Sequence, residues 1–359
     1  RDIQWMVENR LTAMVEQADA EAGSAVVLDP DTGEILALVD VPLVDPSDVD
    51  SLAEEDRGSR SVSGPYEPGS VQKVLTMAAA VDSGAVDPDD VFTVPDSIQR
   101  DGWPRPISDF APHETWPLTP AGILATSSNV GTILAAERMN KDEMRRYLLD
   151  FGYGEVPDLG MPGEEPGIMP EQWSDLRRDT IAYGQGIATT IVHLASAYGA
   201  IANDGARVPA RLVDAVVTPD GEERPVAQGE PVQVVSAETA RQVTTMMEAV
   251  VAPGGTASNI SVDGYRLAGK TGTAERLDPS GAVVGYTATF AGFAPADDPA
   301  LVVVVSIHDP QRGRYGGQLA GPVFADTMKF ALPRLGVAPS GTQAPEIETF
   351  AAGHGGPSN

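Results

Sequence analysis

A serine and a lysine three residues apart are the first pair in this sequence that could act together chemically. Ser70 and Lys73 follow the helix-breaking pair Pro68-Gly69, and the apolar spacing after Ser70 predicts a helix. Ser70 would then lie in the first turn, with Lys73 over the same helix face. A serine becomes a nucleophile when a base removes its proton, and a lysine can be that base if burial or a second cation lowers its pKa. The alternative is an N-cap serine beside a solvated lysine.

A second motif combines a hydroxyl with an amide. Ser127 and Asn129 lie in a predicted helix or in the loop at its start. The hydroxyl could relay a proton, and the amide could hold both a lysine and a substrate carbonyl. Helix-capping Ser and Asn are common, so this pair carries little weight alone.

A third motif lies in a predicted strand near residues 264–275. Lys270 would supply a second positive charge, while Thr271 and Thr273 would supply hydroxyls for a carboxylate. Gly272 would leave the strand backbone open to a ligand. The backbone N–H groups of Thr273 and Ser70 could form an oxyanion hole. An ordinary strand and turn is the alternative interpretation.

Residues 264–271 also match the phosphate-binding pattern G-x-x-x-x-G-K-[ST]. That loop must follow a strand and open a helix whose N–H groups hold phosphate. Here bulky residues separate the glycines, and Gly272-Thr273 follows instead of a helix former. We therefore expect no nucleotide site.

The composition narrows the classes of function. A formal charge of −28 over 359 residues argues against nucleic acid or an acidic membrane surface as a partner. There is no cysteine, and the four histidines match no zinc-site spacing, so we expect no metal and no cofactor. No run of eighteen apolar residues occurs. Arg1 is not an initiator methionine, so we expect a processed or partial chain from which an anchor could have been removed.

The predicted elements would bring the three motifs together. We expect a helix over 2–20, a hairpin of strands 24–28 and 34–39, helices near 119–150, 171–203, 236–252 and 320–333, and strands near 264–275, 283–294 and 300–308. Residues 41–65 should form a polar surface loop, 83–118 should be irregular and 206–230 extended. Strands at both ends with helices between predict an α+β fold, an antiparallel sheet flanked by helices with a mostly helical subdomain. The motifs would meet in the cleft between them.

The order Ser-x-x-Lys, Ser-x-Asn, Lys-Thr-Gly resembles that of penicillin-binding proteins and serine β-lactamases. The chain is similar to the transpeptidase domain of class B penicillin-binding proteins, and in particular to the cell-division type, over roughly residues 2–333. The similarity extends to residues 26–37, 67–70, 127–131, 161–164, 183–186, 200–203, 269–274, 290–295 and 315–317. Residues 188–193 depart from the pattern of this family, which usually has a Thr-Pro pair and a glutamine there.

This resemblance implies a function and a set of site residues. Ser70 would be the acylated nucleophile and Lys73 its base. Ser127 and Asn129 would relay protons and hold substrate. The substrate carboxylate would be bound by the motif in the late strand, that is, by Lys270, Thr271, Gly272 and Thr273.

The implied reaction is D,D-transpeptidation of peptidoglycan stem peptides ending in D-Ala-D-Ala, with β-lactams acylating Ser70. A β-lactamase or D,D-carboxypeptidase of the same fold, or a β-lactam sensor, is the alternative. The resemblance also implies a site outside the cytoplasmic membrane, an N-terminal anchor and a divisome glycosyltransferase partner, both through regions absent from this sequence. The domain would span 1–335, with an α/β part at 1–65 and 236–335, a helical part near 75–235 and a disordered tail at 336–359.

Overall fold

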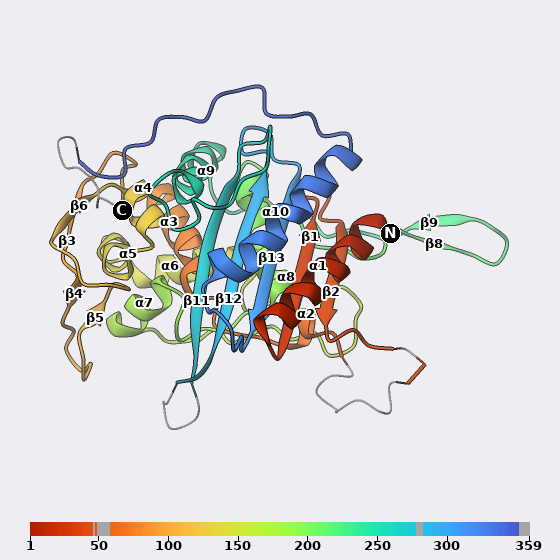
Figure 1. The fold of residues 1–359 in the computed structure, drawn as a ribbon, viewed down its shortest axis with the longest axis horizontal. Coiled ribbons are helices and arrows are strands. Elements are labelled where there is room, and N and C mark those ends of the chain that lie inside the picture. Colours follow the sequence, from red (N-terminus) through yellow and green to blue (C-terminus); the bar gives the residue numbers. More distant parts are fainter. Residues whose placement is uncertain (46, 49–57, 278–282, 352–359) are drawn as a thin grey trace.

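Strands from the two ends of the chain form one antiparallel sheet of five strands in the order β11-β12-β13-β1-β2 (Figure 1). The computed structural model describes residues 1–45, 47, 48, 58–277 and 283–351. The strands of the sheet are β1 (Ala22–Leu28), β2 (Ile35–Val41), β11 (Ala268–Leu277), β12 (Val283–Ala294) and β13 (Leu301–His308). β1 pairs with β13 along the whole length of β1, from Ala22 opposite His308 to Leu28 opposite Val302.

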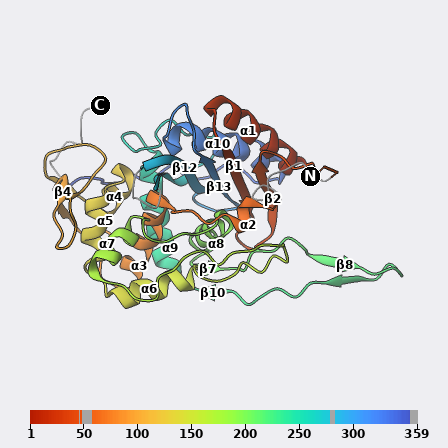
Figure 2. The ribbon, with the colours of Figure 1, turned by 90° about the horizontal axis from the view of Figure 1, so that it is seen from below.

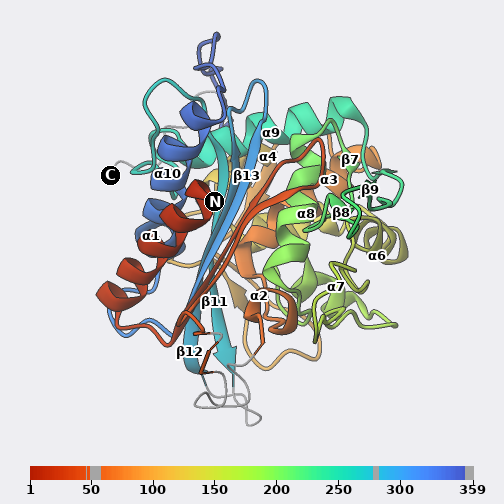
Figure 3. The ribbon, with the colours of Figure 1, turned by 90° about the vertical axis from the view of Figure 1, so that its right-hand side faces the viewer.

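Helices cover both faces of this sheet. Helices α1 (Asp2–Ala18) and α10 (Gly316–Arg334) pack on one face, and α8 (Ile191–Ala202) packs on the other (Figure 3). Every residue of β1 and β13 is buried as a result, which explains the unbroken apolar run Leu-Val-Val-Val-Val in β13. In β2, buried and half-buried residues alternate instead.

The early hairpin forms as its turn residues predict. Gly33 adopts a φ of 69°, and the Asp29 carboxylate accepts hydrogen bonds from the N–H groups of Asp31 at 2.9 Å and Thr32 at 3.1 Å. Part of the predicted 41–65 loop, at 46 and 49–57, lies outside the described residues. The short helix α2 (Arg60–Ser63) follows it.

Most remaining helices gather beside β11, on the side of the molecule opposite β2 (Figure 1). Side chains cap the N-termini of five of them, because serine, threonine and asparagine oxygens accept the free N–H groups there. The helices are α3 (Gln72–Asp82), α4 (Pro120–Thr126), α5 (Asn129–Ala136), α6 (Lys141–Asp150), α7 (Asp175–Ala182) and α9 (Ala237–Val251). The predicted class, an antiparallel sheet with helices and a mostly helical part, is confirmed.

Short strand pairs occupy the segments predicted to be irregular or extended. The β8–β9 hairpin projects away from the rest of the fold (Figure 2). These pairs are β3 (Phe92–Val94) with β6 (Trp116–Leu118), β4 (Ser97–Ile98) with β5 (Ile107–Ser108), β7 (Ala206–Arg207) with β10 (Val232–Gln233), and β8 (Ala215–Val217) with β9 (Glu223–Pro225).

The predicted disorder of the tail is wrong for residues 337–351. The backbone N–H of Thr119 donates to the carbonyl of Thr349, and that of Ala351 donates to Pro117. The Phe350 ring also meets the Trp116 ring edge to face at 5.9 Å. Residues 352–359 lie outside the described part of the chain. No helix in the described ranges has the length and apolar character needed to cross a bilayer.

Candidate active site

Ser70 lies in a single 3-10 turn, η3 (Gly69–Val71), that leads directly into α3. The predicted helix start is therefore confirmed, with a tighter first turn. Gly69 makes this turn possible because its φ is 59° and its N–H donates to the carbonyl of Gly184 at 3.0 Å. Lys73 follows one turn later and is fully buried.

Two buried lysines converge on Ser127. The Lys73 Nζ donates to the carbonyl oxygen of Ser127 and lies 3.3 Å from its Oγ, while the Lys270 Nζ donates to the same Oγ at 2.9 Å. Lys270 also donates to the Thr271 carbonyl at 3.0 Å. Ser127 ends α4 with a φ of 58°, a conformation uncommon for residues other than glycine. The structure thus brings the three motifs together around one hydroxyl.

Burial weakens the hold of both lysines on their protons. It lowers the pKa of Lys73 to about 7, while the negative charge of Asp109 opposes this. The pKa of Lys270 lies well below its usual value, first because of burial and then because of the neighbouring Lys73 charge. Of the two causes expected from sequence, burial and a nearby Lys270 ammonium, burial is therefore the main one for the lowered pKa of Lys73.

Asn129 occupies the first position of α5, as the sequence predicted, but its amide does not hold a lysine. Its Nδ2 donates to the carbonyl of Ser108 at 3.0 Å. The preceding residue, Ser128, caps the helix by accepting from the N–H of Gly131 at 2.8 Å. Asn129 still lines the cleft beside Ser127.

The Lys-Thr-Gly motif lies on β11, the edge strand of the sheet. Thr271 and Thr273 line the cleft, whereas Lys270 lies behind it and is fully buried. Gly272 faces the η3 turn, and a Cβ there would lie 3.2 Å from Val71 Cγ1. The glycine therefore allows the strand to pack closely against η3, and the expectation that it is open to a ligand on this face is wrong. Because the segment before β11 forms a turn and no helix follows it, the phosphate-loop geometry is absent from residues 264–277, as predicted.

The cleft has a volume of about 880 Å³, and several residues outside the three motifs also line it. The Thr256 Oγ1 lies 3.1 Å from that of Thr271. Two aromatic side chains also line the cleft, and the Phe110 and Tyr315 rings meet edge to face at 5.6 Å. The Arg314 guanidinium lies 5.1 Å from the centroid of the Tyr315 ring. Asn259, Glu275 and Tyr286 complete this group.

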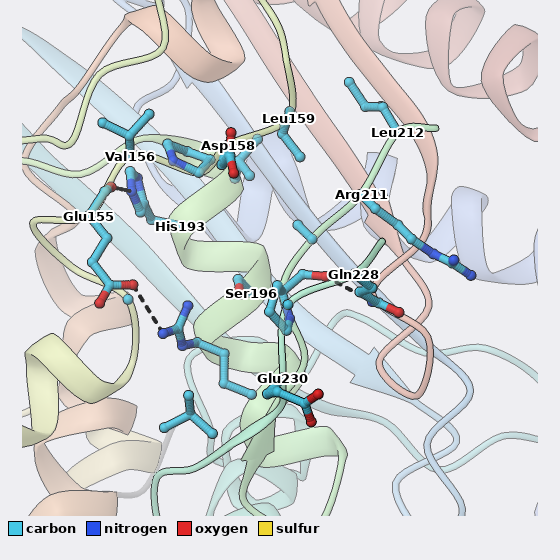
Figure 4. A pocket seen from close by; sticks show the side chains of 18 of the residues that line it. Glu155, Val156, Asp158, Leu159, His193, Ser196, Arg211, Leu212, Gln228 and Glu230 are labelled. Atoms are coloured by element: carbon cyan, nitrogen blue, oxygen red, sulfur yellow. Dashed lines mark hydrogen bonds and ion pairs between the residues drawn. The ribbon is translucent and has the colours of Figure 1, made fainter. Parts of the chain in front are cut away.

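A separate pocket of about 340 Å³ lies near the base of the β8–β9 hairpin and shares no residue with the cleft (Figure 4). Its polar groups mostly satisfy one another. The carbonyl of Glu155 lies 2.7 Å from His193 Nε2, and its carboxylate accepts from Arg207 at 3.1 Å. None of the predicted site residues lies there.

We expect Gly184→Ala to disrupt the η3 turn that carries Ser70. The φ of Gly184 is 93°, and a Cβ would lie 2.0 Å from the Gly69 carbonyl oxygen. Gly102→Ala is a matched control, since its φ is 80° with no heavy atom within 4 Å of the added Cβ. The control should cost about 1–2 kcal/mol of backbone strain, and Gly184→Ala should cost clearly more and slow acylation by penicillin at least ~10-fold. Equal melting temperatures and rates for the two variants would contradict this prediction.

Comparison with known proteins agrees with this fold. The penicillin binding protein transpeptidase domain family matches residues 23–329. The chain belongs to this family.

Individual relatives are similar over nearly the whole chain. PbpB of Mycolicibacterium smegmatis is 39% identical over 96% of this chain, and FtsI of Escherichia coli K12 is 33% identical over 98%. The chain covers 55% and 58% of these two proteins, so it spans little more than half of their length. The crystal structure of penicillin binding protein 3 from Mycobacterium tuberculosis complexed with aztreonam matches with a TM-score of 0.90 at 35% identity, over 98% of this chain and 80% of that one.

Proposed function

We propose that this chain is the transpeptidase domain of a class B penicillin-binding protein of the cell-division type, and that it cross-links peptidoglycan stem peptides through an acyl-enzyme on Ser70. The observation that carries the proposal is Lys73, a fully buried lysine one turn from Ser70 whose pKa is lowered to about 7. The relatives named peptidoglycan D,D-transpeptidase, and those solved with aztreonam or ampicillin, support the choice of reaction and inhibitor.

In the first step the Ser70 Oγ attacks the carbonyl carbon of the penultimate D-Ala, and its proton passes to neutral Lys73. The peptide bond then breaks, and a proton reaches the leaving D-Ala nitrogen through Ser127, whose Oγ lies within 3.3 Å of both lysine Nζ atoms. The backbone N–H groups of Ser70 and Thr273 stabilise the negative charge that develops on the carbonyl oxygen. Asn129, which lines the cleft, holds the substrate backbone.

In the second step an amine of a neighbouring stem peptide attacks the acyl carbon. The ester bond to Ser70 breaks, and the proton lost by the amine returns to the Ser70 oxygen through Lys73. The amine is competent because the site holds it close to the acyl carbon.

The terminal carboxylate of the donor peptide binds at β11. Thr271 and Thr273 present hydroxyls to the cleft, and Lys270 reaches the Thr271 carbonyl from behind at 3.0 Å. Gly272 lets this strand pack against η3. Burial holds the pKa of Lys270 low, and a bound carboxylate would raise that pKa. The carboxylate would therefore favour the protonated, positively charged form of Lys270.

Hydrolysis of the acyl-enzyme, as in a β-lactamase, would require a carboxylate that holds water against the ester. Glu164 is not free for this role, since its two oxygens accept from the N–H groups of Leu159 at 2.9 Å and Met161 at 2.6 Å. Among the described residues that line the cleft, Glu275 is the only acidic one.

A chromogenic β-lactam in excess should therefore give one burst equal to the enzyme present and then almost no further turnover. The reason is that no carboxylate among the described residues holds a water molecule against the ester, whereas the site holds the acceptor amine close to the acyl carbon. The measurement is absorbance after rapid mixing, with the adduct followed by intact mass for many minutes. Sustained turnover of many equivalents per second would favour a β-lactamase, and Glu275→Gln would then show whether that residue activates the water.

The substrate sets the place of action and the partners. Peptidoglycan lies outside the cytoplasmic membrane, so the domain, residues 1–335 with an α/β part and a helical part, works on the outer face of that membrane. A membrane segment in the longer protein would hold it there. Regions outside this chain would contact a divisome glycosyltransferase. The relatives contain such further regions, because the chain covers only 55% and 58% of their length.

A further inference from the structure

Asp109 is a buried carboxylate just outside the three motifs. It directly follows β5, and its side chain is 6% exposed. Its oxygens accept from the Ser128 Oγ at 2.6 Å, the Val130 N–H at 3.0 Å and the His113 Nε2 at 3.0 Å. Two of these three donors belong to the turn that carries Ser127 and Asn129.

Residues 108 and 109 hold that turn from both sides of Asn129. The carbonyl of Ser108 accepts from the Asn129 amide at 3.0 Å, while Asp109 binds the residues immediately before and after it. Ser127 precedes Ser128 and has a positive φ of 58°, which directs its carbonyl and hydroxyl at the lysines. A shift of Ser128 would therefore move the hydroxyl that both lysines contact.

An aromatic stack holds Asp109 in place from the other side. The His113 ring lies on the Trp116 ring at 3.6 Å with an interplanar angle of 10°, and Trp116 meets Phe350 edge to face. Phe110, the next residue in the chain, lines the cleft. The segment from Asp109 to His113 is thus held by the Trp116 ring at one end, and it reaches the cleft through Phe110 at the other.

The charge of Asp109 acts on Lys73 as well. It raises the pKa of Lys73, whereas burial lowers it, and Lys270 is the other charged group that faces Lys73, from β11. Among the described residues, Asp109 is therefore the carboxylate whose charge opposes the effect of burial on the pKa of Lys73.

We propose that Asp109 is a positioning residue for acyl transfer: its hydrogen bonds hold the Ser127–Asn129 turn, and with it the Ser127 hydroxyl, against the two lysines. The proposal rests on the function proposed above. It assigns Asp109 no contact with substrate.

The test is the pH profile of the second-order rate of acylation by penicillin, measured for two variants. Asp109→Asn removes the charge but retains an acceptor oxygen, and we expect the acid limb to move about half a pH unit or more to lower pH, with a plateau reduced ~10-fold or more. Asp109→Glu keeps the charge but moves it, so the plateau should fall while the acid limb stays within about 0.2 units. Asp101→Asn, an exposed change in the same segment, should match the wild type.

The possible outcomes separate this proposal from the function on which it rests. A wild-type chain that forms no adduct would overturn the proposed function itself. If the wild type is labelled but the pH profile of Asp109→Asn keeps the wild-type shape and plateau, the role of Asp109 is overturned. A reduced plateau with an unmoved acid limb would also overturn it, because a purely structural role predicts that result. If Asp109→Asn does not fold, Asp109→Glu decides: a native melting temperature with an unslowed plateau overturns the proposal.

Discussion

Incubation with a penicillin will add the mass of one drug molecule to the wild-type chain, and Ser70→Ala will abolish the adduct. Ser70 lines the cleft at the start of α3, where free N–H groups stabilise developing negative charge, and Lys73 lies one turn away. Intact-mass measurement followed by peptide mapping should place the adduct on Ser70.

The control for this experiment is Ser83→Ala at the opposite end of the same helix, where the hydroxyl only caps the carbonyl of Ala80 at 3.1 Å. This variant should be labelled like the wild type. An adduct that survives Ser70→Ala would show that another residue is the nucleophile.

Lys73→Arg should slow acylation by about 10²–10⁴-fold while the chain remains folded. An arginine keeps the positive charge but cannot lose its proton, whereas a lysine with a pKa of about 7 is neutral roughly half of the time at pH 7. An exposed lysine with a pKa of 10.5 would be neutral in only about one molecule in 3,000 at that pH. Lys329→Arg, on the exposed face of α10, is the matched control. An unchanged rate for Lys73→Arg would show that Lys73 serves only as a structural charge.

The same pKa predicts the pH dependence of the wild type. Because the neutral form of Lys73 is the base, the acylation rate should rise about tenfold per pH unit below 7 and level off above it. A rate that kept rising to pH 10 would mean that burial does not lower this pKa.

The sequence predicted the sheet, its hairpin and most helices because their signals are local. Apolar alternation, a turn around Gly33 and capping residues such as Ser236 act over a few residues. The ordered tail could not be predicted in this way. Its composition is typical of disorder, and it is held by partners far away in the chain, such as the contact of Phe350 with Trp116.

The same distinction applies to the site. Ser70, Ser127 and Lys270 belong to short motifs with a known order. The structure places Lys73 and Lys270 around the Ser127 hydroxyl, and Ser70 lines the same cleft. Thr256 and Asp109 belong to no such pattern, and they reach the site only because α9 ends beside β11 and because the segment after β5 crosses the start of α5. Burial of Lys270 behind Thr271 likewise depends on the packing of β11 against η3.

The pairing of β1 with β13 also determines when the chain can become active. The two strands lie near opposite ends of the sequence, so the sheet closes only after almost all of the chain is available, and closing so long a loop is slow. Ser70 and Lys73 belong to the early part, but Lys270 and the β11 hydroxyls come with the last strands. A fragment that ends before β11 would carry Ser70 without the strand that we propose binds the substrate carboxylate. Reactivity toward β-lactams would therefore report that synthesis and folding of the domain are complete.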